Sequence, residues 1–335
     1  MNFKNIKKKL IVLCLVGAMS VSAFTGCGRD TKIVFTTGLS GNQLFKIGSS
    51  KCTMPEAMVY LTTFYNQYAD IYGEEMWNYD FGGVSLEGHV KDVVLSKLAQ
   101  IKIMNLMAQE QDICLTKEEE QQVLKAADAY FEKLEENLKK TENLTEDVVK
   151  QVYLEYAIAN KVYSSITESA EMEISDDEAR TVTVQTIYFS NAEMKNKAEQ
   201  VQKRIKEGED FETLAAEYSE DKQIVKRFGR GTTEGHFEEI LFSMDEGEVS
   251  DLIETSEGLY IVKCISTMDD EATQENKLVL AEQRKKEAFS RAYTEVAEST
   301  HSQYRDKQWN ALTLKKEIHK TDANFFEIYH EFMNQ

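Results

Sequence analysis

Proline and basic residues are scarce in this sequence. One proline, Pro55, occurs in 335 residues, and 39 Lys+Arg face 58 Asp+Glu, for a formal net charge of −19. Because proline breaks helix interiors, its near-absence favours a mostly helical protein and removes proline-rich linkers from consideration. The acidic balance argues against a nucleic-acid partner, because nucleic acids are bound through basic surfaces that displace counterions. It is compatible with a well-solvated surface or with the handling of basic, unfolded polypeptides.

Cysteine is also rare. After Cys27 the chain carries only Cys52, Cys114 and Cys264, and their spacings suggest no metal site. We interpret them as separate small core residues, with a Cys52–Cys114 disulfide as an open alternative. The sequence lacks a P-loop, an HExxH motif and a Cys-x-x-Cys pair, so no metal, nucleotide or redox cofactor is predicted.

The N-terminus has the pattern of an export signal. A lysine-rich start precedes an apolar run from Leu10 to Val16, and a segment of this kind is a secretory signal, too short for a comfortable membrane span. The stretch FTGC, ending at Cys27, resembles a bacterial lipobox, in which Cys27 is lipidated. We therefore predict a signal peptide at residues 1–26. Phe24 departs from the usual leucine, so cleavage nearby or an uncleaved anchor remains an alternative.

Residues 27–50 are polar and glycine-containing apart from the strand-like stretch LFKIG, and we expect a tether there. Beyond it, Ser/Thr-x-x-Glu capping boxes predict successive helix starts, at Thr53, Thr116 and Ser175. The first of these helices carries aromatic residues at three-to-four spacing, which is typical of a core stripe. A groove for apolar peptide is the alternative. We predict a helical N-terminal domain at residues 51–179.

The pattern changes near residue 180. The stretch TVTVQTIYFS alternates and is rich in β-branched residues, as a strand should be. Two amphipathic helices, a glycine-rich loop, a short helix and a final pair of strands follow, in the order β-α-α-β-α-β-β. This order predicts a compact α/β domain at residues 180–267, inserted between helical segments. Residues 268–335 return to helical patterns, so the predicted fold class is α+β.

Four stretches of the inserted domain resemble the parvulin (rotamase) domain of peptidyl-prolyl cis-trans isomerases. They are EGEDFETLAAEYSED (207–221), FGRG (228–231), GEVS (247–250) and GLYIVK (258–263). The surrounding plan is similar to that of PrsA-type extracytoplasmic foldases and SurA-type periplasmic chaperones. That resemblance implies a mostly helical chaperone lobe, in which residues 268–335 pack on the N-terminal domain.

The resemblance also implies a site. Parvulins use a methionine and a phenylalanine as a proline pocket, a cysteine or aspartate facing the twisting carbonyl, and two histidines beneath. The pocket positions fall on Thr233 and Phe237, and the catalytic positions fall on Asp221, Thr186 and Tyr260. Both histidines and the methionine are therefore replaced, although the Thr186 and Tyr260 hydroxyls could still pair. Phe237 as a core residue and Asp221 as a turn residue are the structural alternatives.

We therefore predict a membrane-anchored extracytoplasmic folding factor of bacteria. It would be held by lipid on Cys27 at the outer face of the cell membrane and would bind newly exported, unfolded polypeptides. Weak or absent isomerase activity is expected, because several catalytic positions are replaced. The first alternative is an active prolyl isomerase that assists the folding of secreted proteins. The second is a structural adaptor in a surface assembly.

Overall fold

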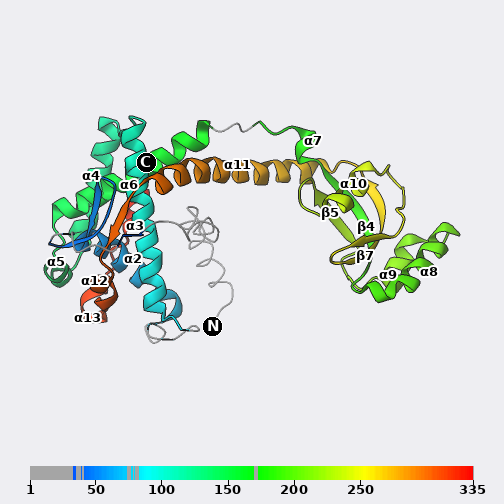
Figure 1. Cartoon of the computed structure of the whole chain (residues 1–335), viewed down its shortest axis with the longest axis horizontal. Coiled ribbons are helices and arrows are strands. Elements are labelled where there is room, and N and C mark those ends of the chain that lie inside the picture. Colours follow the sequence, from blue (N-terminus) through cyan, green and yellow to red (C-terminus); the bar gives the residue numbers. More distant parts are fainter. Residues whose placement is uncertain are drawn as a thin grey trace. The chain divides into compact units, whose positions relative to one another are not determined.

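The computed structural model describes residues 33–34, 39, 41–73, 77, 79, 83–169 and 173–334 (Figure 1). The chain divides into two compact units, one of Met1–Ser169 with Glu287–Gln335 and one of Ala170–Lys286. The predicted signal peptide and Cys27 lie outside the described residues. Within the described ranges, no helix is both long enough and apolar enough to cross a membrane.

The first unit is mainly helical. Its helices before the second unit are α2 (Met54–Tyr72), α3 (Leu86–Glu110), α4 (Lys117–Lys133), α5 (Glu136–Glu142) and α6 (Glu146–Ser169). After the second unit come α12 (Asp306–Ala311), α13 (Lys316–His319) and α14 (Phe325–Met333).

Two of the predicted capping boxes begin these helices. The Thr53 hydroxyl accepts a hydrogen bond from the Glu56 amide at 3.4 Å, and the Thr116 hydroxyl accepts one from the Glu119 amide at 3.2 Å. At the start of α4, the Glu119 carboxylate also accepts from the Thr116 amide at 2.7 Å. Each box thus satisfies backbone donors that have no partner within the helix.

A small sheet belongs to the same unit. Its strands are β1 (Ile33–Val34), β8 (Ser302–Tyr304), β2 (Gln43–Ile47) and β3 (Ser50–Thr53), in that spatial order. Strands β1 and β8 are parallel, and the other pairs are antiparallel. Residues 43–50, expected in the tether, therefore lie in a sheet. Their partner strand β8 follows about 250 residues later in the chain, a pairing that no local pattern reveals.

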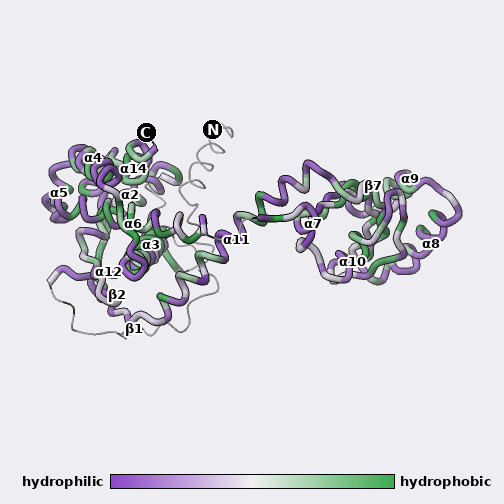
Figure 2. The backbone as a smooth tube through the Cα atoms, turned by 90° about the horizontal axis from the view of Figure 1, so that it is seen from above, coloured by the Kyte–Doolittle hydropathy of each residue, from purple (hydrophilic) through white to green (hydrophobic). Residues whose placement is uncertain are grey.

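The core of the first unit joins its two chain segments. Phe325 of α14 is fully buried, and its ring centroid lies 4.9 Å from that of Tyr60 and 4.3 Å from that of Tyr153. The Tyr153 hydroxyl donates to the Phe325 carbonyl oxygen at 3.1 Å. Figure 2 shows hydrophobic residues gathered where α2, α6 and α14 meet, whereas α5 is largely hydrophilic. The predicted helical lobe of N- and C-terminal segments together is confirmed.

A buried ammonium ties three elements of this core together. Lys102 of α3 lies 2.6 Å from the Glu56 carboxylate of α2 and 2.6 Å from the Glu155 carboxylate of α6, and its side chain is 2% exposed. Cys52 is buried nearby, and this burial, followed by the charge of Glu56, raises the pKa of its thiol. Cys52 and Cys114 are free thiols, so the alternative disulfide does not form, and Cys114 is exposed rather than in a core.

The second unit has the predicted β-α-α-β-α-β-β order. Its elements are β4 (Thr181–Phe189), α8 (Lys195–Lys206), α9 (Phe211–Tyr218), β5 (Val225–Gly229), α10 (Gly235–Ser243), β6 (Ile253–Thr255) and β7 (Gly258–Ser266), with a short 3-10 helix at Ala192–Met194. The strands form an antiparallel sheet in the order β5-β4-β7-β6. One apolar cluster packs α10 on one face of this sheet, and another packs α8 and α9 on the opposite face.

Two flanking helices belong to the second unit as well. They are α7 (Asp176–Ala179) and the first half of α11 (Asp270–Ser299). The Asn276 amide donates to the Ala179 carbonyl at 3.0 Å, and the Thr181 amide donates to the Thr273 hydroxyl at 3.1 Å. The compact unit thus extends beyond residues 180–267 on both sides, because polar contacts bind both helices to the start of β4.

We expect Lys102→Met to destabilise the first unit by about 3–5 kcal/mol, because it leaves the buried Glu56 and the half-buried Glu155 carboxylates without a counter-charge. Both tryptophans, Trp77 and Trp309, are buried in this unit, so urea unfolding followed by tryptophan fluorescence reports on it alone. The matched control is Lys150→Met, since Lys150 also bridges two carboxylates, Asp128 and Glu146, but at the surface. Equal effects of the two substitutions would contradict the prediction.

Candidate functional site

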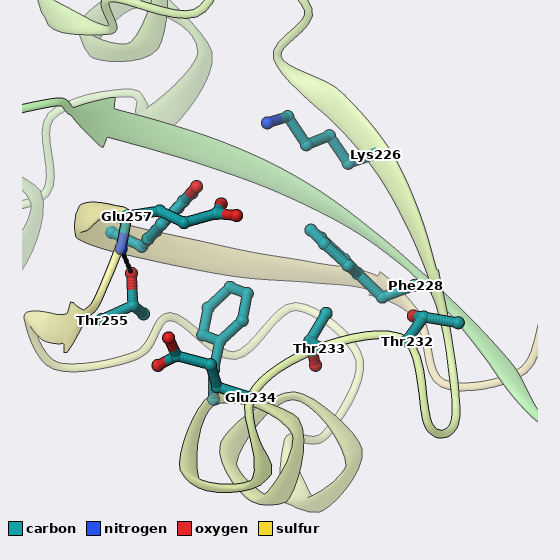
Figure 3. Close-up of a pocket in the computed structure, with 9 residues that line it drawn as sticks. Lys226, Phe228, Thr232, Thr233, Glu234, Thr255 and Glu257 are labelled. Carbon is teal, nitrogen blue, oxygen red and sulfur yellow. Dashed lines mark hydrogen bonds between the residues drawn. The ribbon is translucent and has the colours of Figure 1, made fainter. Parts of the chain in front are cut away.

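A pocket of about 200 Å³ opens on the face of the second unit's sheet that α10 covers (Figure 3). Strand β5, the loop that follows it, α10 and the β6–β7 hairpin contribute its lining: Lys226, Phe228, Thr232, Thr233, Glu234, Phe237, Thr255, Glu257 and Tyr260. Three of the predicted site residues, Thr233, Phe237 and Tyr260, therefore lie together in one pocket.

The β6–β7 hairpin positions Tyr260. Gly258 has φ +148°, and a Cβ on it would lie 2.3 Å from the Phe189 carbonyl oxygen, so only glycine fits at this close approach to β4. Two residues later, Tyr260 lies opposite Tyr188 of β4 in the antiparallel pairing. Their ring centroids are 4.8 Å apart. The tight turn thus fixes the register that brings Tyr260 to the pocket.

Aromatic rings form the apolar wall of the pocket. The Phe237 ring centroid lies 5.0 Å from that of Tyr260 and 5.6 Å from that of Phe228. Phe237 is 5% exposed and Tyr260 is 7% exposed. Phe237 therefore serves both the domain core and the pocket wall, the two roles that the sequence left open. Tilted and edge-to-face rings at these distances offer a rigid apolar surface for a small ring.

The polar edge of Tyr260 faces acidic groups. Burial, followed by the charge of Glu257, raises the pKa of the Tyr260 hydroxyl to about 12, and Tyr188 and Asp221 add to the shift. The neighbouring Tyr188 hydroxyl donates to the Glu257 carbonyl oxygen at 2.7 Å. The Tyr260 hydroxyl is therefore protonated at physiological pH.

Asp221 does not line the pocket itself but forms an ion pair with the lining residue Lys226. It lies in the loop between α9 and β5, where its carboxylate contacts the Lys226 ammonium at 2.6 Å and accepts from the Gln223 amide at 2.9 Å. These two interactions, the lysine first, hold the pKa of Asp221 below its usual range. The Lys226 ammonium also lies 5.9 Å from the Tyr260 ring centroid and 6.0 Å from that of Tyr188. Asp221 is therefore an ionised, already paired carboxylate.

Thr186 does not line the pocket. It is fully buried on β4, where its backbone pairs with Val262 of β7. Its hydroxyl donates to the Ile224 carbonyl oxygen at 3.3 Å, and its backbone amide donates to the same oxygen at 2.8 Å. The Thr186 hydroxyl therefore pairs with the backbone rather than with Tyr260.

Six lining residues were not identified from the sequence: Lys226, Phe228, Thr232, Glu234, Thr255 and Glu257. Lys226 and Phe228 are separated by one residue on β5, so strand alternation places them on the same face. That signal was available once β5 had been assigned. Thr233 carries a further feature, because its hydroxyl oxygen is buried and has no hydrogen-bond partner among the described residues. It is a free polar contact for a ligand.

No metal site accompanies this pocket. In the part of the chain that the structure describes, no group of three or more His, Cys, Asp or Glu side chains could hold a metal ion. What the pocket offers is an apolar wall, one paired lysine and several carboxylates.

Comparison with known families matches this unit. Residues 184–266 match the family model described as rotamase, a PPIC-type PPIase domain. The order of elements and the pocket on the α10 face belong to the same segment. The second unit is therefore a parvulin-type domain.

Sequence similarity to other proteins extends beyond the second unit. A foldase protein PrsA of Caldanaerobacter subterraneus is 27% identical over 58% of this chain and 63% of that relative, and a foldase protein PrsA of Clostridium botulinum is 22% identical over 87% and 95%. A crystal structure of the peptidylprolyl isomerase PrsA from Bacillus cereus matches 90% of this chain and 97% of its own, with a TM-score of 0.39 and 19% identity. The chain spans less than two thirds of the Caldanaerobacter relative. Residues 184–266 therefore carry a parvulin-type domain, and the chain as a whole is similar to PrsA foldases.

We expect Lys226→Met to raise the pKa of Asp221 towards its ordinary value, because the substitution removes the hydrogen bond that contributes most to the shift. A pH titration of the Asp221 side-chain carboxyl by ¹³C NMR measures this directly. In the unmodified chain the pair stabilises the fold above the ordinary aspartate pKa of about 4, and this contribution is lost as the pH falls through the folded-state value. Lys222→Met, a neighbouring exposed lysine, should leave the titration unchanged.

Proposed function

We propose that this protein is an extracytoplasmic folding factor that binds exported, unfolded polypeptides, with a parvulin-type unit that binds prolyl segments and isomerises them weakly or not at all. The relatives named foldase protein PrsA support the general role. The observation that carries the proposal is the pocket of the second unit, which keeps an aromatic wall while Asp221 and Thr186 have partners of their own.

The aromatic wall supports binding. A proline ring is small, apolar and rigid, and it can lie against Phe237 and Tyr260 without displacing a hydrogen-bonded group. Burial of this kind of surface contributes roughly 25 cal/mol per Å². The ring contacts are the same whether the preceding peptide bond is planar or twisted. Binding both forms equally well does not lower the barrier between them.

The polar groups support weak catalysis. Prolyl isomerisation breaks no bond, and an enzyme must favour the twisted amide over the planar one across a barrier of about 18–20 kcal/mol. Two of the three positions that the resemblance implies for catalysis have other partners here. Asp221 is paired with Lys226, and the Thr186 hydroxyl donates to a backbone carbonyl. Neither is free to act selectively on the twisted form.

An active isomerase is the second candidate, because one observation favours it. The charge of Asp221 acts on Tyr260, and Lys226 lies within 6.0 Å of the Tyr188 and Tyr260 ring centroids. The groups that line the site therefore form one electrostatically connected set. A bound peptide that draws Lys226 towards its carbonyl oxygen would release Asp221 for a role in the reaction.

The full chain should suppress the aggregation of a denatured client at an equimolar ratio, while NMR exchange on a prolyl tetrapeptide gives the uncatalysed rate. Asp221→Ala and Phe237→Leu are the matched site variants. Phe237→Leu keeps more of the buried volume than alanine would, since Phe→Ala in a core costs about 3–5 kcal/mol.

An acceleration of exchange that either variant reduces would favour the active isomerase instead. Failure to suppress aggregation at this ratio would contradict the chaperone role and favour an adaptor in a surface assembly.

We also propose that Cys27 is lipidated and anchors the protein at the outer face of the bacterial membrane, where newly exported chains emerge. The FTGC sequence supports this assignment. Expressed in a bacterial host, the full chain should fractionate with membranes, whereas Cys27→Ala should shift most of it to the soluble extracytoplasmic fraction, because a lipid anchor supplies about 0.8 kcal/mol per buried CH₂ group. Unchanged fractionation of the variant would contradict the anchor.

A further inference from the structure

The rim of the pocket carries an uneven set of charges. Two carboxylates, Glu234 and Glu257, line it, together with one ammonium, Lys226. That ammonium is already paired with Asp221 at 2.6 Å. Three carboxylates therefore lie at the pocket with one ammonium. That ammonium, Lys226, is paired with Asp221, which is not one of the lining residues.

The two rim carboxylates have no cationic partner. Glu234 accepts hydrogen bonds from the backbone amide and the hydroxyl of Ser256, with the amide at 3.2 Å. Glu257 interacts with the Tyr260 hydroxyl. Among the described residues, neither carboxylate has a lysine, arginine or histidine nitrogen within 4.0 Å. Their negative charge is available to a ligand.

The two rim carboxylates, Glu234 and Glu257, lie on the same side of the pocket. Figure 3 shows Glu234, Thr255 and Glu257 on one side of the pocket, while Lys226 and Phe228 extend from β5 on the other. The Ser256 contacts hold Glu234 at the β6–β7 turn, which also carries Glu257. A peptide whose proline ring lies on the aromatic wall would therefore place a neighbouring side chain beside these carboxylates.

We propose that this pocket selects prolyl segments with a lysine or arginine next to the proline, and disfavours segments with an acidic residue there. The proposal rests on the proposed binding of prolyl peptides by the second unit. Selection of this kind is a difference between two affinities, an attraction for the cationic peptide and a repulsion of the acidic one. It also agrees with the overall acidic charge of the chain, which attracts basic polypeptides from a distance.

The size of the effect follows from exposure. Glu234 and Glu257 are exposed, and solvent-exposed ion pairs contribute modestly, so two of them give a preference of roughly 3- to 10-fold between lysine and glutamate peptides at low salt. Because exposed charges are screened over about 10 Å at 0.1 M ionic strength and about 3 Å at 1 M, the preference should shrink as salt is raised.

The test compares three peptides that differ only beside the proline, with Lys-Pro, Ala-Pro or Glu-Pro at the centre of the same neutral sequence. Dissociation constants are measured on the ¹⁵N-labelled full chain from shifts of the backbone amides of residues 226–237 and 255–260. The expected order of affinity is Lys-Pro, then Ala-Pro, then Glu-Pro. Glu234→Gln/Glu257→Gln should remove this order without abolishing the binding of Ala-Pro.

The control is Glu239→Gln/Glu246→Gln, which changes the net charge equally at exposed positions outside the pocket lining. It should keep the order of the three peptides. Equal affinities of the unmodified chain for all three peptides would overturn the charge selection but not prolyl binding. The same conclusion would follow if both double variants changed the order of affinities in the same way. Absence of any shift with all three peptides would overturn the proposed function, and the charge selection with it.

Discussion

The pairing of β4 with β7 is the constraint on which the second unit depends. These two strands form the centre of its sheet, and each contributes residues to the apolar clusters on both faces. Their register places Tyr188 opposite Tyr260 and Thr186 opposite Val262. A shift by one residue would turn every side chain to the opposite face. The pocket, its aromatic wall and the burial of Thr186 all follow from this one alignment.

The pocket of the second unit is lined by aromatic rings and fixed charges. Tyr260 brings a ring that packs on Phe237, and its hydroxyl stays protonated because burial and nearby carboxylates raise its pKa. Lys226 neutralises Asp221 and lies near both tyrosine rings. Such a set of groups can hold and orient a segment. These groups are not arranged to transfer protons. The pocket's preference among peptides is therefore expected to depend on peptide charge and on salt concentration rather than on pH near neutrality.

The sequence predicted the positions of helices and strands better than it predicted which strands pair and which side chains meet. Capping boxes and alternation gave the start of α4 and the extent of β4, because those signals are local. The sheet that joins β2 to β8 was not predicted, since a three-residue strand has no pattern of its own. At the site, motif alignment led to Phe237, Thr233 and Tyr260, whereas Lys226 and Glu257 lie outside the motifs that carried the resemblance. Their roles depend on contacts across strands, and a single sequence does not encode those contacts visibly.

The insertion of one unit into another sets an order for assembly during synthesis. The second unit is continuous in sequence, so all of its strands are available once residue 286 has been made. The first unit is discontinuous: Tyr60 and Tyr153 remain without their partner ring until Phe325 of α14 is present. Domains form as their segments become available. The parvulin-type unit can therefore be complete while the helical unit still exposes the aromatic surface that α14 later covers. A newly made copy of this protein is then, for a time, a partly folded chain with exposed apolar surface.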